Sequence, residues 1–109
     1  MIKAKMFHSK QMICGFEISG HAQSGPHGHD LVCAAVSAVS FGAVNSLIKL
    51  CEIEPHVKQG GEGGFLKITL PQKLTEAQLQ KAHTLLEGML VSLETIENDY
   101  SEYIKILHS

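Results

Sequence analysis

The chain has 109 residues, a length that fits one compact domain spanning residues 1–109 and leaves little room for a second. Hydrophobic residues make up 44% and charged residues 18%, which excludes a disordered or fibrous chain. Nine lysines, with no arginine, are set against eleven acidic residues, for a formal net charge of -2. Because proteins that neutralise nucleic-acid phosphates normally carry excess basic charge, we expect no direct nucleic-acid binding as the main activity.

The three cysteines, Cys14, Cys33 and Cys51, are odd in number and widely spaced, which argues against a disulfide framework. The first residues carry charges but no apolar run of the length of a signal peptide. These features predict a cytoplasmic protein with reduced thiols.

The N-terminal half predicts two strands and a helix. Residues 2–7 and 13–19 alternate in polarity and are expected to pair as a hairpin across the polar break at 8–11. Residues 20–28 contain several glycines and a proline and predict a loop. Asp30 is then expected to be the N-cap of a helix from Leu31 to about Leu50.

This helix is apolar nearly all round, a pattern shared by membrane spans and buried helices. Several hydrogen-bonding residues and Lys49 interrupt the apolar run, and such groups are costly in lipid. We therefore expect a buried central helix and no membrane partner.

The C-terminal half repeats the order of the first. A strand at 56–59, a glycine-rich turn at 60–64 and a strand at 65–70 predict a second hairpin. Thr75 and Gln78 match a capping box, and an amphipathic helix follows. The predicted fold is α+β, in the order strand-strand-helix-strand-strand-helix, with a small sheet packed against two helices.

Side chains that can act as nucleophile, acid or base cluster where the glycine-bearing loop meets the first predicted helix. With Asp30 as N-cap, Cys33 would be the third residue of the first turn, beside unpaired backbone N–H groups and the positive end of the helix dipole. Thiols in such places ionise readily, which predicts a nucleophile.

A thiolate nucleophile also needs a base that can later protonate a leaving group, and imidazole suits neutral pH. His21 lies twelve positions before Cys33, and a loop of that length can bring the ring to the sulfur. His27 and His29 lie in the same loop as rival bases. Asp30, besides capping the helix, could orient the imidazole.

The run Gly-His-Ala, the spaced glycines and then Asp-Leu-Val-Cys-Ala-Ala-Val-Ser closely resemble the ribosomal-processing cysteine protease family Prp. Later segments agree, among them Phe41-Gly-Ala-Val-Asn45, the glycines at 60–64 and Met89-Leu-Val-Ser-Leu93. The similarity covers nearly the whole chain, and the His-to-Cys segment is its most specific part.

The resemblance implies a Cys–His thiol protease, a hydrolase without a cofactor, that takes part in ribosome biogenesis in Firmicutes-type bacteria. Such enzymes remove a short N-terminal extension from large-subunit ribosomal protein twenty-seven, cutting after a Phe-Phe-Ala-like stretch. The resemblance also implies a homodimer and a mobile active-site loop. Carried over by position, Cys33 is the nucleophile and His21 the base; the supporting positions are Asp30 and Ser37, and the loop glycines are Gly20, Gly25 and Gly28.

Two other function classes stay open from the residues alone. His21, His27, His29 and Cys33 together offer three nitrogens and a sulfur, a donor set that zinc accepts, although no paired ligand motif is present. Alternatively, the chain could be a non-catalytic interaction domain that dimerises through its amphipathic helix.

A phosphate-binding loop is not supported. Gly20 and Gly25 have the spacing of phosphate-loop glycines, but Pro26 and His27 follow where that motif requires Lys and Ser or Thr.

Overall fold

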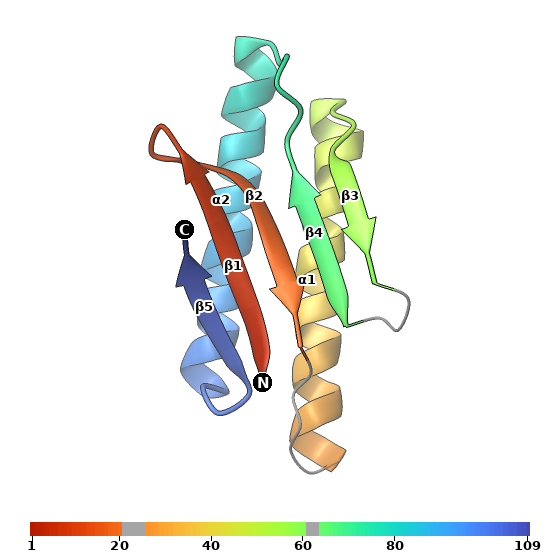
Figure 1. Cartoon of the computed structure of the whole chain (residues 1–109), viewed down its shortest axis with the longest axis vertical. Coiled ribbons are helices and arrows are strands. Elements are labelled where there is room, and N and C mark those ends of the chain that lie inside the picture. Colours follow the sequence, from red (N-terminus) through yellow and green to blue (C-terminus); the bar gives the residue numbers. More distant parts are fainter. Residues whose placement is uncertain (21–25, 61–63) are drawn as a thin grey trace.

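In the described part of the chain, five strands form one mixed sheet, and two long helices pack against one of its faces (Figure 1). The computed structural model describes residues 1–20, 26–60 and 64–109, and side chains of the first helix from residue 31 onward. This arrangement confirms the predicted α+β class. The elements in chain order are β1 (Ile2–Ser9), β2 (Met12–Ser19), α1 (Pro26–Cys51), β3 (His56–Gln59), β4 (Phe65–Thr69), α2 (Glu76–Asp99) and β5 (Ile104–His108).

The strand order across the sheet is β3-β4-β2-β1-β5. The predicted hairpin of β1 and β2 is confirmed: the strands are antiparallel, and Lys10 and Gln11 at the turn both have positive φ, 52° and 66°. Two positive φ angles in succession are typical of the hairpin turn whose twist matches that of paired strands. Strand β4 pairs antiparallel with both β2 and β3, so the second predicted hairpin is also confirmed.

Strand β5 was missed by the sequence analysis, which counted four strands. It pairs parallel with β1, and Ile2 N–H donates to the Tyr103 carbonyl at 2.8 Å just before β5 begins. Strand β4 also runs parallel to β5, and helix α2 supplies the long crossover connection that joins these two strands. Only the alternation of Ile104 and Ile106 around Lys105 signals this five-residue strand in the sequence.

Helix α1 begins at Pro26, five residues before the predicted start at Leu31. Proline suits the first turn of a helix, because its φ is already helical and its missing N–H has no partner there. Gly28 costs about 1 kcal/mol inside a helix, an amount that a long helix tolerates. Asp30 is therefore the fifth residue of α1 and not its N-cap, and Gly28 belongs to the helix and not to the loop.

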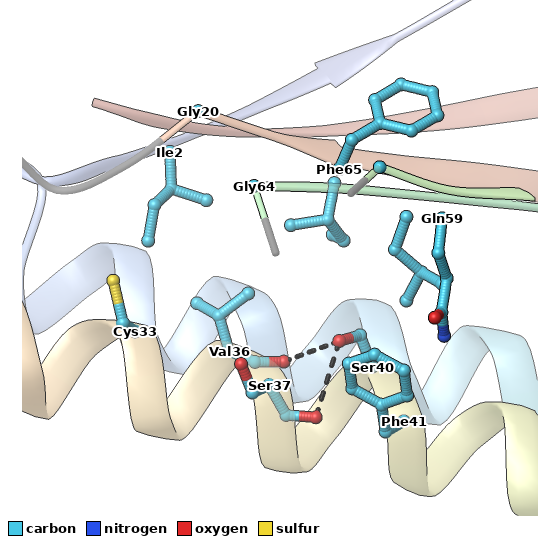
Figure 2. A pocket seen from close by; sticks show the side chains of 13 residues that line it. Ile2, Gly20, Cys33, Val36, Ser37, Ser40, Phe41, Gln59, Gly64 and Phe65 are labelled. Carbon is cyan, nitrogen blue, oxygen red and sulfur yellow. Dashed lines mark hydrogen bonds between the residues drawn. The ribbon is translucent and has the colours of Figure 1, made fainter. Parts of the chain in front are cut away.

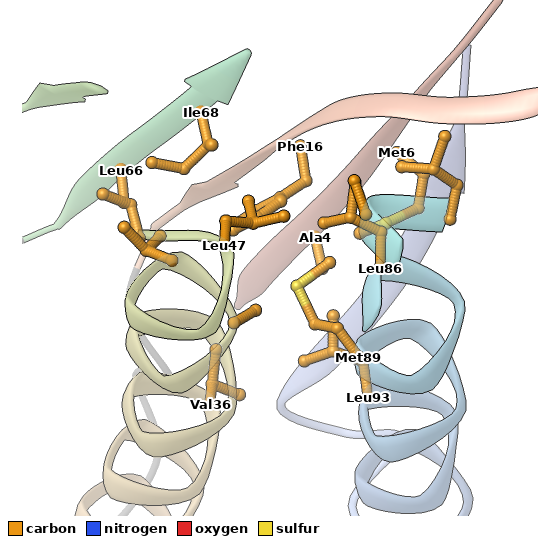
Figure 3. Close-up of a cluster of buried hydrophobic side chains, with 14 of the residues drawn as sticks. Ala4, Met6, Phe16, Val36, Leu47, Leu66, Ile68, Leu86, Met89 and Leu93 are labelled. Atoms are coloured by element: carbon orange, nitrogen blue, oxygen red, sulfur yellow. The ribbon is translucent and has the colours of Figure 1, made fainter. Parts of the chain in front are cut away.

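The core lies between the helices and the inner face of the sheet (Figure 3). The capping box of α2 is confirmed, with Gln78 N–H donating to the Thr75 hydroxyl at 3.1 Å and Thr75 N–H donating to Gln78 Oε1 at 2.9 Å. The buried residues of α2 follow one another at intervals of three and four, which confirms the predicted amphipathic helix: Ala82, Leu86, Met89 and Leu93.

Helix α1 is less buried than its composition predicted. One face packs against the sheet, but Leu31, Phe41 and Ile48 on the other sides are exposed. Within the described residues, the segment Leu31–Cys51 is long and apolar enough to cross a bilayer, with 28% of its most apolar stretch buried in the protein. The outward side of α1 is thus an apolar surface that the described part of the chain does not cover.

Candidate active site

A cavity of about 120 Å³ opens between α1 and the ends of β2 and β4 (Figure 2). Most of its wall is apolar, and none of the described residues that line it is charged. The cavity is lined by Ile2, Ile18, Gly20, Cys33, Val36, Ser37, Ser40, Phe41, Gln59, Gly60, Gly64, Phe65 and Leu66.

Helix α1 supplies the sulfur and two hydroxyl groups of this cavity. Figure 2 shows the Cys33 sulfur directed from the helix toward Ile2 and Gly20. Ser37 follows one turn later and is exposed, so its hydroxyl is accessible beside the cysteine. Ser40 is buried and donates to the Val36 carbonyl at 2.7 Å, which satisfies its hydroxyl within the helix.

The opposite wall is held by backbone contacts of glycines. Gly20 has φ +85°, a conformation that other residues rarely adopt, and a Cβ there would overlap the Met1 carbonyl oxygen. Its N–H donates to the Gly64 carbonyl at 3.0 Å, and Gly60 N–H donates to the Phe65 carbonyl at 3.0 Å. These bonds tie the end of β2 and the ends of the β3–β4 connection to the rim of the cavity.

The three cysteines are thiols in different surroundings. Cys51 is 3% exposed, and burial raises the pKa of its thiol, with nearby Lys81 opposing the effect. A buried thiol with a raised pKa is a poor nucleophile at neutral pH. Cys14 on β2 and Cys33 are both half-buried, but only Cys33 lines the cavity.

The predicted place of Cys33 at the helix N-terminus is wrong. Because α1 begins at Pro26, Cys33 is its eighth residue and lies about 10 Å along the axis from the helix start. The dipole effect falls off within the first turn, and only the first four N–H groups lack helical partners. The helix end therefore does not stabilise a thiolate at Cys33.

Several predicted residues cannot be placed. His21 and Gly25 lie outside the described residues, and the side chains of His27, His29 and Asp30 are not described. Among the described residues, no three His, Cys, Asp or Glu side chains gather to hold a metal ion. Of the predicted site residues, the structure therefore brings together Gly20, Cys33 and Ser37.

The sequence analysis missed the aromatic and amide members of the cavity. Phe41 lies two turns after Cys33, while Phe65 begins β4 and Gln59 ends β3. Helical spacing could have placed Phe41 near Cys33. Gln59 and Phe65 carry no local signal, because strand pairing brings them to the cavity; the Phe65 ring itself points away from α1 (Figure 2).

Comparison with known proteins agrees with a site built around a cysteine. The family model described as cysteine protease Prp matches residues 1–105. The ribosomal processing cysteine protease Prp of Bacillus subtilis (strain 168) is 47% identical over 107 residues, which cover 97% of this chain and 96% of the relative. The protein of the same name from Staphylococcus aureus (strain Mu50 / ATCC 700699) is 40% identical over 82% of this chain and 80% of its own length.

Solved structures of high similarity extend over the whole chain. The S. aureus ribosomal processing protease Prp with a covalently linked product peptide superposes with a TM-score of 0.86 at 34% identity, covering both chains completely. SMU.848 from Streptococcus mutans has a TM-score of 0.84 at 32% identity and covers all of this chain and 96% of its own. With a family model, close relatives and a shared fold in agreement, the chain belongs to the Prp family of ribosomal processing cysteine proteases.

Proposed function

We propose that the chain removes a short N-terminal extension from large-subunit ribosomal protein twenty-seven, cutting after a Phe-Phe-Ala-like stretch. One observation carries the proposal: Cys33 lines an apolar cavity together with Gly20, the residue directly before His21 in the chain. The S. aureus relative has also been solved with a substrate peptide, at a TM-score of 0.84 to this chain. A cavity lined by Phe41 and by aliphatic side chains such as Ile2, Ile18 and Val36 suits a substrate with bulky apolar residues.

In this mechanism the Cys33 thiolate attacks the carbonyl carbon of the scissile bond. The C–N bond then breaks, the His21 imidazolium gives its proton to the departing amine, and a thioester remains on Cys33. His21 next takes a proton from water, whose oxygen attacks the thioester carbon and releases the thiolate. The acid and the base of the two half-reactions are thus the same imidazole.

Asp30 and Ser37 are the proposed supporting residues. Positions 30, 33 and 37 of α1 follow one another at intervals of three and four, so they share one side of the helix. Ser37 is exposed at the cavity, where its hydroxyl can bond to the peptide backbone of a substrate. Asp30 would orient the imidazole, a role independent of the helix cap.

A peptide that spans the extension junction tests the substrate. We expect mass spectrometry to find one cut, after the Phe-Phe-Ala stretch. Replacing both phenylalanines by serine should lower kcat/KM by at least about 100-fold, because burial of each ring contributes about 2 kcal/mol. A control peptide with serine substitutions well beyond the cut should be cleaved normally. Equal cleavage of the two modified peptides would contradict recognition of apolar residues.

We further propose that the protein is a cytoplasmic homodimer in which α1 packs against α1 of a second copy. Six exposed positions of α1 follow the 3-4 spacing of a coiled-coil seam. Small alanines in the seam would let two helices approach closely, and an asparagine can set the register by bonding across the pair. The seam consists of Leu31, Ala34, Ala38, Phe41, Asn45 and Ile48.

A charge in the seam should separate the dimer. Ile48 is 46% exposed in the single chain, and Ile48→Glu would place a carboxylate in the apolar contact. Light scattering after size exclusion should then report monomer for Ile48→Glu and dimer for Val91→Glu, a matched change on α2 at a residue 59% exposed. A wild-type monomer, or dissociation by Val91→Glu alone, would overturn this interface.

A further inference from the structure

Charge is divided between the two layers of the fold, which the net charge of -2 does not reveal. The five strands carry five lysines and one acidic residue, Glu17. Helix α2 has the reverse composition, with five acidic residues and the single lysine Lys81. The sheet layer is therefore cationic and the α2 side anionic.

Strand register brings the sheet lysines onto one face. Lys5 pairs with Glu17, Glu17 with Lys67 and Lys67 with Lys58, which forms one row across four strands. In the next row Lys3 is opposite Lys105. The alternate residues of these strands are buried against the helices, so the lysines point to the uncovered side of the sheet. We call this side the cationic face; it is the side toward the viewer in Figure 1 and contains Lys3, Lys5, Lys58, Lys67 and Lys105.

An aromatic ring lies among these lysines. The ammonium groups of Lys5 and Lys67 lie 5.9 and 5.4 Å from the centre of the Phe7 ring. Phe7 is half-buried and is paired with Gly15, which has no side chain to cover it. The face thus combines positive charge with a ring on which a planar group can stack.

We propose that the cationic face binds single-stranded RNA. Ammonium groups on neighbouring strands are attached about 5 Å apart, and those two residues apart on one strand about 7 Å apart, so several can meet successive phosphates of a flexible strand. Open sheets with aromatic side chains on their inner strands are a common platform for splayed RNA bases. An acidic peptide or a lipid headgroup would pair with the lysine ammonium groups, but neither supplies a planar base that stacks on the Phe7 ring.

RNA binding gives the proposed protease a way to meet its substrate, and in this respect the inference rests on the proposed function. A ribosomal protein must neutralise RNA phosphates and is itself cationic, so the lysine face repels it when it is free. RNA held on this face would instead attract the same protein and deliver its extension to the cavity. The binding experiment below uses no substrate peptide, so its failure is separate from a failure of the proposed cleavage.

The test measures anisotropy of a fluorescent single-stranded RNA of mixed sequence titrated with the full chain at several salt concentrations. We expect salt-dependent binding to the wild type. The double variant Lys5→Gln, Lys67→Gln should bind about tenfold more weakly and reduce the slope of log K against log salt by about 1.4, the amount for two lost phosphate contacts. Phe7→Leu should weaken binding about tenfold with no change in the slope, because it removes stacking and no charge.

Matched variants and ligands decide the outcome. The control double variant Lys73→Gln, Lys81→Gln also removes two positive charges, but at positions outside the sheet, and it should leave RNA binding unchanged. All of these variants should cleave the junction peptide at the wild-type rate. Absence of RNA binding at low salt would overturn the proposal. So would equal weakening by both lysine pairs, or tighter binding of polyglutamate or of phosphatidylserine vesicles than of RNA. Lys5 and Lys67 are partly exposed, and their variant leaves Phe7 unchanged. The lysine comparison therefore stays decisive even if the Phe7 variant misfolds.

Discussion

Substitution of Cys33 by alanine should abolish cleavage of the junction peptide and leave the fold intact. The sulfur is the nucleophile in the proposed mechanism, so its loss should lower kcat by at least about 1,000-fold. Alanine is well tolerated in a helix, and the side chain removed is only half-buried. Cleavage measured by mass spectrometry, together with thermal unfolding, separates loss of chemistry from loss of structure.

The other cysteines provide the controls for this variant. Cys14→Ser should keep most of the activity, since Cys14 lies on β2 outside the cavity. Iodoacetamide should label Cys33 well before Cys51, whose thiol is buried and has a raised pKa. Retained turnover in Cys33→Ala, or an equal loss in Cys14→Ser, would remove Cys33 from the role of nucleophile.

Gly20→Ala is expected to damage both stability and activity. Gly20 has φ +85°, and an added Cβ would overlap the Met1 carbonyl, so β1 or the end of β2 must shift. We expect a loss of about 1–3 kcal/mol in the free energy of unfolding. Because Gly20 lines the cavity and precedes His21, kcat/KM should also fall by about tenfold or more.

Gly88→Ala is the matched control for this substitution. A Cβ at Gly88 meets nothing within 4 Å, and the residue lies inside α2. Alanine there should raise the free energy of unfolding by about 0.5–1 kcal/mol with unchanged activity. Chemical denaturation and peptide cleavage measured on both variants give the comparison. If Gly20→Ala matches Gly88→Ala in both measurements, the glycine at the cavity rim has no special role.

The exposed side of α1 and the cavity are neighbouring parts of one helix. Phe41 belongs to both, since it lines the cavity and also lies in the proposed dimer seam. Dimerisation would therefore cover part of the Phe41 side chain next to the site. For this reason Ile48, which does not line the cavity, is the better residue for testing the dimer.

The start of α1 shows where local sequence rules mislead. Asp30 has the chemistry of an N-cap, and Gly28 that of a loop residue, yet the helix runs through both from Pro26. This shift of the helix start removes the predicted stabilisation of the Cys33 thiolate, because that stabilisation required Cys33 to lie in the first turn. The candidate site does not depend on it: the cavity still joins Cys33 with Gly20 and Ser37.

By itself the sequence determined the features that neighbouring residues control. The β1–β2 hairpin, the capping box at Thr75 and the buried stripe of α2 all follow from hydrophobic period and turn chemistry within a few residues. The segment from Gly20 to Ser37 likewise identified the candidate nucleophile and its family from residue order alone.

Only the tertiary structure decided which distant residues meet. Strand β5 is stabilised by pairing with β1, about a hundred residues away, and the pairing of β4 with β2 brings Leu66 to the cavity that Cys33 lines. Strand pairing also places the lysines on one face of the sheet. The net charge of the chain does not show this, because it sums the lysines with the acidic residues of α2. Local propensity cannot encode such contacts, because register and layer packing set them after the elements have formed.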